Sequence, residues 1–262
     1  MSSRRDLSIA GVVLGWITLI LVLDHFATHD QQRWLGVGTW LVLLALLCGE
    51  SRRTRLQVAV VVCFATAVEW TFAGWLGVYV YRLHDVPWFV PPGHGLVYLA
   101  ALAIGRSPAV RSHRRFLIPA TAAAASAYAA WGLFVSSRLD VLGAFWALCL
   151  LGFLRWSRQP TVFAGAFVIV TYLELLGTHI GAWTWSVKDP IAHLVAMGNP
   201  PSGAAGGYGF FDLAALGVTD WVTARRRTSQ NVASIAGEGA QDLVVEQPVG
   251  AHHGAEARIG AA

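Results

Sequence analysis

Long apolar runs, separated by short stretches that contain charged residues or proline, dominate the chain of 262 residues. A window of about 19 residues, the length of helix that crosses a bilayer, finds about eight such runs. The pattern therefore predicts an all-α fold, a polytopic membrane bundle of about eight transmembrane helices. The predicted spans are residues 8–26, 33–49, 56–82, 88–105, 115–136, 138–155, 161–185 and 203–223.

The composition agrees with a membrane protein. Hydrophobic residues make up 55% of the chain and charged residues 13%, with a mean hydropathy of +0.53. Soluble domains carry about 25% charged residues. Cys48, Cys63 and Cys149 lie inside apolar runs, which indicates buried thiols rather than a disulfide framework. The sequence contains no nucleotide-binding glycine loop and no nucleophile elbow, so ATP-driven action and a soluble catalytic module are excluded within this chain, and no nucleic-acid partner is expected.

The basic residues predict the orientation. They lie before the first span, at Arg4 and Arg5, and in the alternate loops at residues 50–55, 106–115 and 155–159, and again after the last span, at 224–227. The other loops are nearly balanced in charge. The positive-inside rule therefore places both termini in the cytoplasm of a multi-pass protein of the cell membrane.

A sequence pattern in the first half of the chain recurs in the second half. At the constant spacing that separates Glu69 from Glu174, glycine, arginine and glutamate recur, and an aromatic motif and a Pro-Pro pair follow in the same order. The matched positions are Gly38 with Gly143, Arg53 with Arg158, Glu69 with Glu174, residues 77–81 with 181–185, and residues 91–92 with 200–201.

This recurrence predicts an internal duplication. Four spans in each repeat give both halves the same orientation, so the expected architecture is two parallel four-helix repeats related by a pseudo-two-fold axis along the membrane normal. The predicted domains are a first membrane repeat at 1–110, a second at 111–227, and a disordered cytoplasmic tail at 228–262, where Gly, Ala and polar residues follow no period.

Three carboxylates that fall near the middle of predicted spans are the candidate catalytic residues. Glu69 and Glu174 fall near the predicted midplane, where a carboxylate costs about 3 kcal/mol on insertion scales, so both should face the bundle interior. Asp212 lies at a similar predicted depth, and we expect it to pair with Glu174, to share a proton and to supply an acid. Glu69 would be the pseudo-symmetric partner or base. The alternative is that each glutamate only pins helices together by hydrogen bonds.

Aromatic and polar side chains around these carboxylates are the candidate substrate contacts. Aromatic rings beside a protonated carboxylate would stabilise a cation, although Trp183 also fits an interfacial belt. The Pro-Pro pairs begin helices whose N-terminal amides are potential anion sites, with His94 and Asn199 beside them. The candidate substrate-binding residues are Trp70, Trp75, Tyr79, Tyr81, His94, His179, Trp183 and Asn199.

No metal site and no cofactor are predicted. His25 and His29 have the i, i+4 spacing that can place two imidazoles on one face of a helix. A second group of ligands with recognisable spacing does not follow in the sequence.

The order of Glu69, the Gly-x-Tyr-x-Tyr motif and Val-Pro at 86–87, with Gly-x-Trp-x-Trp after Glu174, resembles the carotenoid-biosynthesis hydratases, which are integral membrane proteins acting on polyprenoid ends. The chain is more loosely similar to the small membrane terpene and lycopene cyclases, which use intramembrane acids. The Pro-Pro-Gly-His-Gly phrase at 91–95 departs from the hydratase pattern. The resemblance implies lyase or isomerase chemistry on an isoprenoid substrate.

We therefore expect a membrane enzyme that protonates a prenyl or other lipid alkene and so hydrates, cyclises or isomerises it. Two alternatives remain open at the level of the sequence: a proton-coupled transporter of a small solute or lipid, and an assembly subunit with no chemistry. The expected partners are the membrane and a lipid or isoprenoid substrate. The oligomeric state stays open.

Overall fold

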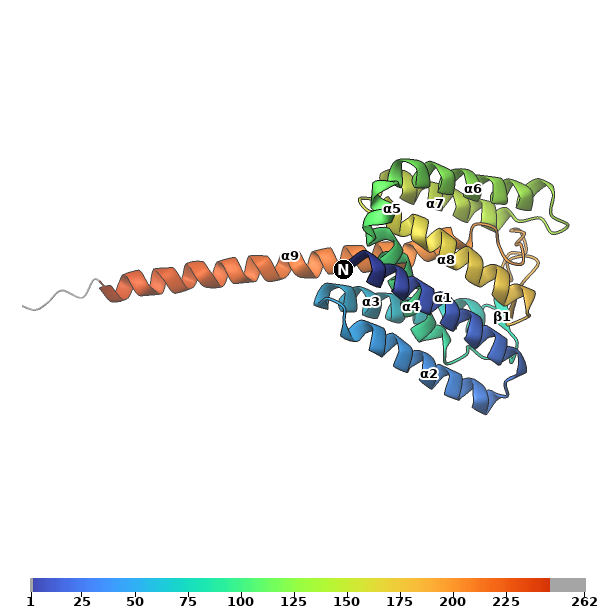
Figure 1. Ribbon diagram of the computed structural model, residues 1–262, viewed down its shortest axis with the longest axis horizontal. Coiled ribbons are helices and arrows are strands. Elements are labelled where there is room, and N and C mark those ends of the chain that lie inside the picture. Colours follow the sequence, from blue (N-terminus) through green and yellow to red (C-terminus); the bar gives the residue numbers. More distant parts are fainter. Residues whose placement is uncertain (1, 246–262) are drawn as a thin grey trace, which may run out of the picture. The chain divides into compact units, whose positions relative to one another are not determined.

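Residues 2–245 are described by a computed structural model, which is mostly helical (Figure 1). The chain divides into two compact units, residues 1–219 and 220–262, and everything described below up to the tail lies in the first. The elements are α1 (Ser2–Phe26), α2 (His29–Cys48), α3 (Arg52–Glu69), the π-helix η1 (Trp70–Trp75), β1 (Tyr79–Tyr81), α4 (Val90–Arg106), α5 (Pro108–Ser112), α6 (Arg114–Phe134), α7 (Val141–Trp156), α8 (Pro160–His179), β2 (Trp183–Trp185) and α9 (Ala204–Val245).

Four helical segments are long and apolar enough to cross a membrane: Arg4–Phe26, Arg52–Trp75, Arg114–Phe134 and Pro160–His179. The helix Val141–Trp156 is also apolar but shorter. Large apolar side chains project outward from several helices, whereas a soluble monomer seldom exposes extended apolar surface. The predicted helical fold is confirmed, and its long apolar helices are compatible with a membrane protein.

Local signals in the sequence account for where the helices begin. Thr28 and Gln31 form a capping box at the start of α2, in which the Thr28 side chain accepts from the Gln31 amide and the Gln31 side chain accepts from the Thr28 amide. Ser51 and Asp140 cap α3 and α7 through their side-chain oxygens. Helix α8 begins at Pro160, in the first turn, where a proline loses no hydrogen bond.

Two predicted spans are wrong at their ends. The predicted span 56–82 stays α-helical only to Glu69, continues as η1 and then turns at Gly77, which has a φ of 67°. The predicted span 161–185 leaves the helix at His179 and turns at Gly181, with a φ of 76°. Backbone in this left-handed region ends a helix, and glycine adopts it without steric cost. Each of these two helices is therefore followed by a glycine turn and a short strand.

Helix α4 forms the core of the first unit and is buried along nearly its whole length. It packs closely on α8, because glycines replace side chains at the contact. A Cβ atom on Gly105 would lie 2.7 Å from the Val162 Cα, and one on Gly165 would lie 2.7 Å from the Ala101 carbonyl oxygen. The Thr161 hydroxyl donates to the Gly105 carbonyl at 2.8 Å. Small residues of this kind let apolar helices approach closely.

A network of charged side chains ties one end of the bundle together. The Arg106 guanidinium donates to both carboxylate oxygens of Glu50, each at 2.7 Å, and to Asp6 at 2.8 Å. Arg5 donates to Glu50 at 3.2 Å and to the Gly49 carbonyl at 2.6 Å. The network joins α1, the turn between α2 and α3, and the last residue of α4.

Helix α9 runs on to Val245. The structure therefore carries helix through residues 228–245, where the sequence analysis predicts a disordered tail. Ala, Gln and Val recur in this segment, and helix propensity is high for the first two. Residues 246–262 of the predicted tail lie outside the described residues.

Candidate functional site

Two short strands from distant parts of the chain pair beside the predicted midplane carboxylates. Strands β1 and β2 are antiparallel, with Tyr79 opposite Trp185 and Tyr81 opposite Trp183. The four aromatic residues are buried, whereas the central residue of each strand, on the other face, is exposed. Alternation along the strands therefore turns all four rings toward the bundle interior.

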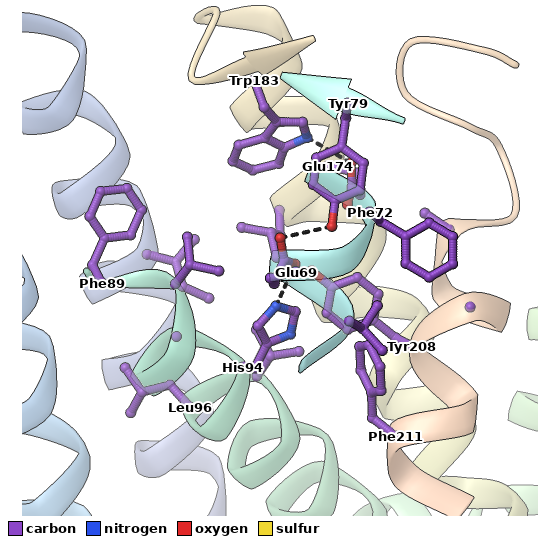
Figure 2. Close-up of a pocket in the computed structure, with 18 of the residues that line it drawn as sticks. Glu69, Phe72, Tyr79, Phe89, His94, Leu96, Glu174, Trp183, Tyr208 and Phe211 are labelled. Atoms are coloured by element: carbon purple, nitrogen blue, oxygen red, sulfur yellow. Dashed lines mark hydrogen bonds and ion pairs between the residues drawn. The ribbon is translucent and has the colours of Figure 1, made fainter. Parts of the chain in front are cut away.

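The two tyrosines of β1 hold Glu69, the last residue of α3. Tyr79 and Tyr81 donate their hydroxyl hydrogens to Oε2 of Glu69 at 2.7 and 2.8 Å. His94, in the first turn of α4, places Nε2 at 2.8 Å from Oε1 of the same carboxylate. Figure 2 shows the tyrosine hydroxyl and the imidazole meeting the carboxylate from opposite sides. Glu69 is buried and has three partners.

The two tryptophans of β2 hold Glu174, in the last turns of α8. Trp183 and Trp185 both donate their indole Nε1–H groups to Oε2 of Glu174, each at 3.1 Å. Within the part of the chain that the structure describes, Oε1 of Glu174 accepts no hydrogen bond. Glu174 also lines the cavity described next, so this oxygen is available to a bound molecule.

Both carboxylates line one cavity of about 270 Å³ (Figure 2). Its wall is mostly apolar and rich in aromatic rings from α1, α3, η1, β1, α4, α7, β2 and α9. The Tyr208 ring lies 5.1 Å from the His94 ring, and Phe211 meets His94 edge-on at 5.4 Å. The further aromatic residues of the wall are Trp16, Phe64, Phe72, Phe89, Trp146 and Phe210.

The two halves of the site differ at one position. In the repeated pattern, Gly203 stands where the first half has His94. A Cβ atom on Gly203 would lie 2.0 Å from the Gly143 carbonyl oxygen and 2.3 Å from the Ala147 amide nitrogen, so α7 leaves no space for a side chain. Glu69 therefore has an imidazole neighbour, whereas Glu174 has none.

The structure brings most of the predicted site residues together. Those that line the cavity are Glu69, Glu174, Tyr79, Tyr81, His94 and Trp183. The placement of Trp70 and Trp75 beside the carboxylates is wrong: these side chains are 62% and 81% exposed. Both belong to η1, where the wider π-helical turn changes the direction of successive side chains relative to an α-helix.

The predicted pair of Glu174 and Asp212 is also wrong. Asp212 is buried in α9 but does not line the cavity, and the carboxylate that shares the cavity with Glu174 is Glu69. Asp212 lies four residues beyond Tyr208, one helical turn further from the cavity.

Two other predicted substrate contacts lie outside the cavity. His179 is exposed at the end of α8. Asn199 is exposed as well, and its side-chain oxygen accepts from the Trp185 amide at 3.0 Å. Asn199 therefore supports β2 and does not line the site.

Sequence reasoning missed several residues of the wall. Trp185 was recoverable, because it matches Tyr81 in the repeated motif and so should hold Glu174 as Tyr81 holds Glu69. Tyr208 and Phe211 carry a weaker signal: they occupy the same face of α9 as helical neighbours three residues apart, downstream of the second Pro-Pro pair. No feature of the sequence indicates that Phe72 lines the cavity, because the direction of its side chain depends on the π-helix η1.

Among the described residues, no group of three or more His, Cys, Asp or Glu side chains is placed to hold a metal ion. No family model matches the chain, and neither a curated protein nor a solved structure matches it.

Proposed function

We propose that this protein is an integral membrane enzyme that protonates an alkene in a prenyl, isoprenoid or other lipid. The observation that carries the proposal is the pair of buried carboxylates, Glu69 and Glu174, in one apolar cavity lined by aromatic rings. An alkene is a weak base and needs a strong proton donor in a dry site, and the resulting carbocation needs an environment that does not quench it.

Glu174 is the proton donor in this scheme. Its Oε2 is occupied by two indoles, and its Oε1 is open to the cavity. Transfer of a proton from Oε1 to one alkene carbon leaves the positive charge on the other carbon. Water then adds through its oxygen, or an internal double bond attacks and closes a ring, or a neighbouring carbon loses a proton to give the isomer.

Glu69 receives the proton that the last step releases. Three hydrogen-bond partners hold its carboxylate in place at the cavity wall. His94 lies behind it and can hold the proton in turn. The reaction thus begins with a proton on Glu174 and ends with one on the Glu69–His94 pair.

The aromatic wall suits a cationic intermediate. Ring faces attract a cation with about 2 kcal/mol or more when the contact is desolvated. Tyr208, Phe211 and Phe72 lie around the carboxylates (Figure 2). The cavity, at about 270 Å³, is just below the usual range of ligand pockets, roughly 300–1,000 Å³. It therefore suits the end of a long lipid rather than the whole molecule.

The proposal includes the finer membrane architecture. The long helices α1–α4 and α6–α9 would cross the cell membrane as two repeats of four, with both termini in the cytoplasm. The correspondence of hydrogen bonds supports the repeats, because Tyr79 and Tyr81 hold Glu69 as Trp183 and Trp185 hold Glu174. The strand register supports the pseudo-two-fold axis, because exchange of β1 and β2 leaves the pairing unchanged.

The experiment compares the lipids extracted from cells with and without the gene, by mass spectrometry. We expect an isoprenoid whose mass differs by one water, or an isomer with a different retention time, in cells that carry the wild-type gene. Glu174→Gln keeps the shape of the side chain and removes the acid, so the product should disappear. Phe211→Leu should reduce product formation roughly fivefold, because it removes about 1 kcal/mol of ring–cation attraction from the transition state.

The matched control is Phe116→Leu, since Phe116 is exposed on α6, far from the cavity wall, and should give the wild-type lipid profile. Protein levels in the membrane are compared for all variants. If cells that make isoprenoid lipids give identical lipid profiles with and without the gene, the enzyme proposal is overturned.

A proton-coupled transporter is the second candidate. The observation that favours it is the position of the carboxylates, both on the buried face of the strand pair that joins the two predicted repeats, since transporters built from repeats bind their substrates at the repeat interface. Uptake of a solute into vesicles that depends on a pH gradient, without any change in lipids, would support this candidate instead.

A further inference from the structure

Among the described residues, three buried polar atoms that lack a hydrogen-bond partner lie close to the site, on the neighbouring helices α4 and α9. They are Nδ1 of His94, the hydroxyl of Tyr98 and Oδ2 of Asp212. The three residues are 5%, 1% and 4% exposed. An unsatisfied polar atom in a buried position costs roughly 1–3 kcal/mol. Three such atoms in one region therefore require an explanation.

Their spacing along the helices is regular. Tyr98 follows His94 by four residues on α4, and Asp212 follows Tyr208 by four residues on α9. The rings of His94 and Tyr208 lie 5.1 Å apart at the cavity, and Tyr98 interacts electrostatically with Asp212. His94 and Tyr208 thus form one layer, and Tyr98 and Asp212 form a second layer one helical turn, about 6 Å, further from the strand pair.

A bridging water molecule would have the length needed to join these layers. A single water molecule that accepts one hydrogen bond and donates another spans about 5.6 Å, since each such bond is about 2.8 Å long. A buried water is stable where two to four polar groups surround it. Nδ1 of His94, the Tyr98 hydroxyl and Oδ2 of Asp212 are polar groups of this kind, without competing protein partners.

The second layer lies further toward the end of the bundle at which α3 begins, with Tyr98 at the middle of α4. Tyr98 interacts electrostatically with Arg53, which is exposed in the first turn of α3. This is the end that the positive charges of the sequence predict to be cytoplasmic. Among the described residues, the charged groups that act electrostatically on Tyr98 are Asp212 from α9 and Arg53 from α3.

We propose that Tyr98 and Asp212, with water between them, form a proton relay that connects the Glu69–His94 end of the cavity with the end of the bundle at which Arg53 lies. The relay rests on the proposed function. A proton that arrives at Nδ1 of His94 allows Nε2 to pass its own proton to Oε1 of Glu69, so one proton enters the ring and one leaves. The same steps in reverse carry away the proton that Glu69 receives after each turnover. Tyr98 and Asp212 are positioning and relay residues and do not touch the substrate.

The test uses the full-length protein in liposomes and follows protonation of the buried carboxyl groups by infrared spectroscopy after a pH jump. The band is assigned to Glu69 or Glu174 by its loss in Glu69→Gln or Glu174→Gln. We expect the rate of band formation to fall at least tenfold in Tyr98→Phe and in Asp212→Asn. Tyr172→Phe, which changes an exposed tyrosine of α8, should keep the wild-type rate.

Tyr98→Phe distinguishes a relay from a structural role. It removes only a hydroxyl that has no protein partner, so a structural role predicts unchanged or higher thermal stability and an unchanged rate. A tenfold slower rate with unchanged stability supports the relay. If Asp212→Asn does not fold, Tyr98→Phe alone decides.

The two proposals can fail separately, because the infrared readout needs no substrate. Wild-type protonation rates in Tyr98→Phe overturn the relay, even if the lipid product is made. A slowed rate in Tyr98→Phe, together with lipid profiles that do not respond to the gene, supports the relay and overturns the enzyme.

Discussion

Glu50 shows at the scale of one residue how buried charge is stabilised in this protein. Hydrogen bonds from the Arg106 guanidinium lower the pKa of the Glu50 carboxyl below its ordinary value of 4.5, against the opposing effect of burial. A group whose pKa is lower in the folded than in the unfolded state stabilises the fold while it is deprotonated. This contribution is complete above pH 4.5 and is lost as the pH falls through the folded-state pKa.

We therefore predict that Glu50→Gln lowers the free energy of unfolding by about 2 kcal/mol at pH 7. This is less than the roughly 3–5 kcal/mol of a broken buried pair, because Asp6 still binds Arg106. The measurement is thermal unfolding in detergent between pH 7 and pH 3. The wild type should lose stability below about pH 4.5, and the variant should lose less. Equal pH profiles for both proteins would contradict this role of Glu50.

The individual site residues were predictable to different degrees. A carboxylate inside an apolar run is expensive, so Glu69 and Glu174 stand out in the sequence and both line the cavity. Asp212 stands out for the same reason, but the sequence does not specify its direction from α9. The predicted position of the Trp75 side chain was wrong, because the sequence gives no sign of the π-helix that turns this side chain outward.

At the scale of the elements, the contact between α4 and α8 depends on glycine. We predict that Gly165→Ala lowers the melting temperature, because the added methyl would press on the Ala101 carbonyl oxygen at 2.7 Å and force the helices apart at a cost of about 1–3 kcal/mol. Thermal unfolding followed by circular dichroism gives the comparison.

Gly11→Ala is the matched control, since a Cβ atom on Gly11, also within a helix, meets nothing within 4 Å. There alanine should be neutral or should raise stability by up to about 1 kcal/mol, as intrinsic helix propensity predicts. An equal change in melting temperature for Gly165→Ala and Gly11→Ala would show that the contact between α4 and α8 does not depend on the absence of a side chain at Gly165.

The element boundaries follow from local chemistry where a cap or a proline is present, as at Thr28, Ser51 and Pro160. The ends at Glu69 and His179 were missed, although Gly77 and Gly181 were visible in the sequence. A hydropathy window averages over a glycine turn and an aromatic strand, because Tyr and Trp count as apolar. The strand pair also requires a partner far along the chain, which no local pattern supplies.

At the scale of the whole molecule, the basic loops predict one orientation. A reporter fused after Arg227 should be cytoplasmic, and one inserted near Asp189 should be exterior. Asp189 accepts hydrogen bonds from four backbone amides of its own loop, so the insertion is best made beside that loop, before residue 188. Both reporters on the same side, or the reverse arrangement, would remove the proposed depth of Glu69 and Glu174.

The strand pair has a consequence for how the molecule moves. Alternating-access carriers rock one half against the other around the bound substrate. Here the backbone ladder is extended by the Arg82 amide to the Ala182 carbonyl and by the Ser186 amide to the Val78 carbonyl, each at 2.9 Å. Rocking at this end would break several hydrogen bonds together, each worth about 1 kcal/mol. The β1–β2 strand pair therefore holds the two halves together at this end. We expect a lipid to reach Glu69 and Glu174 laterally from the membrane, between helices.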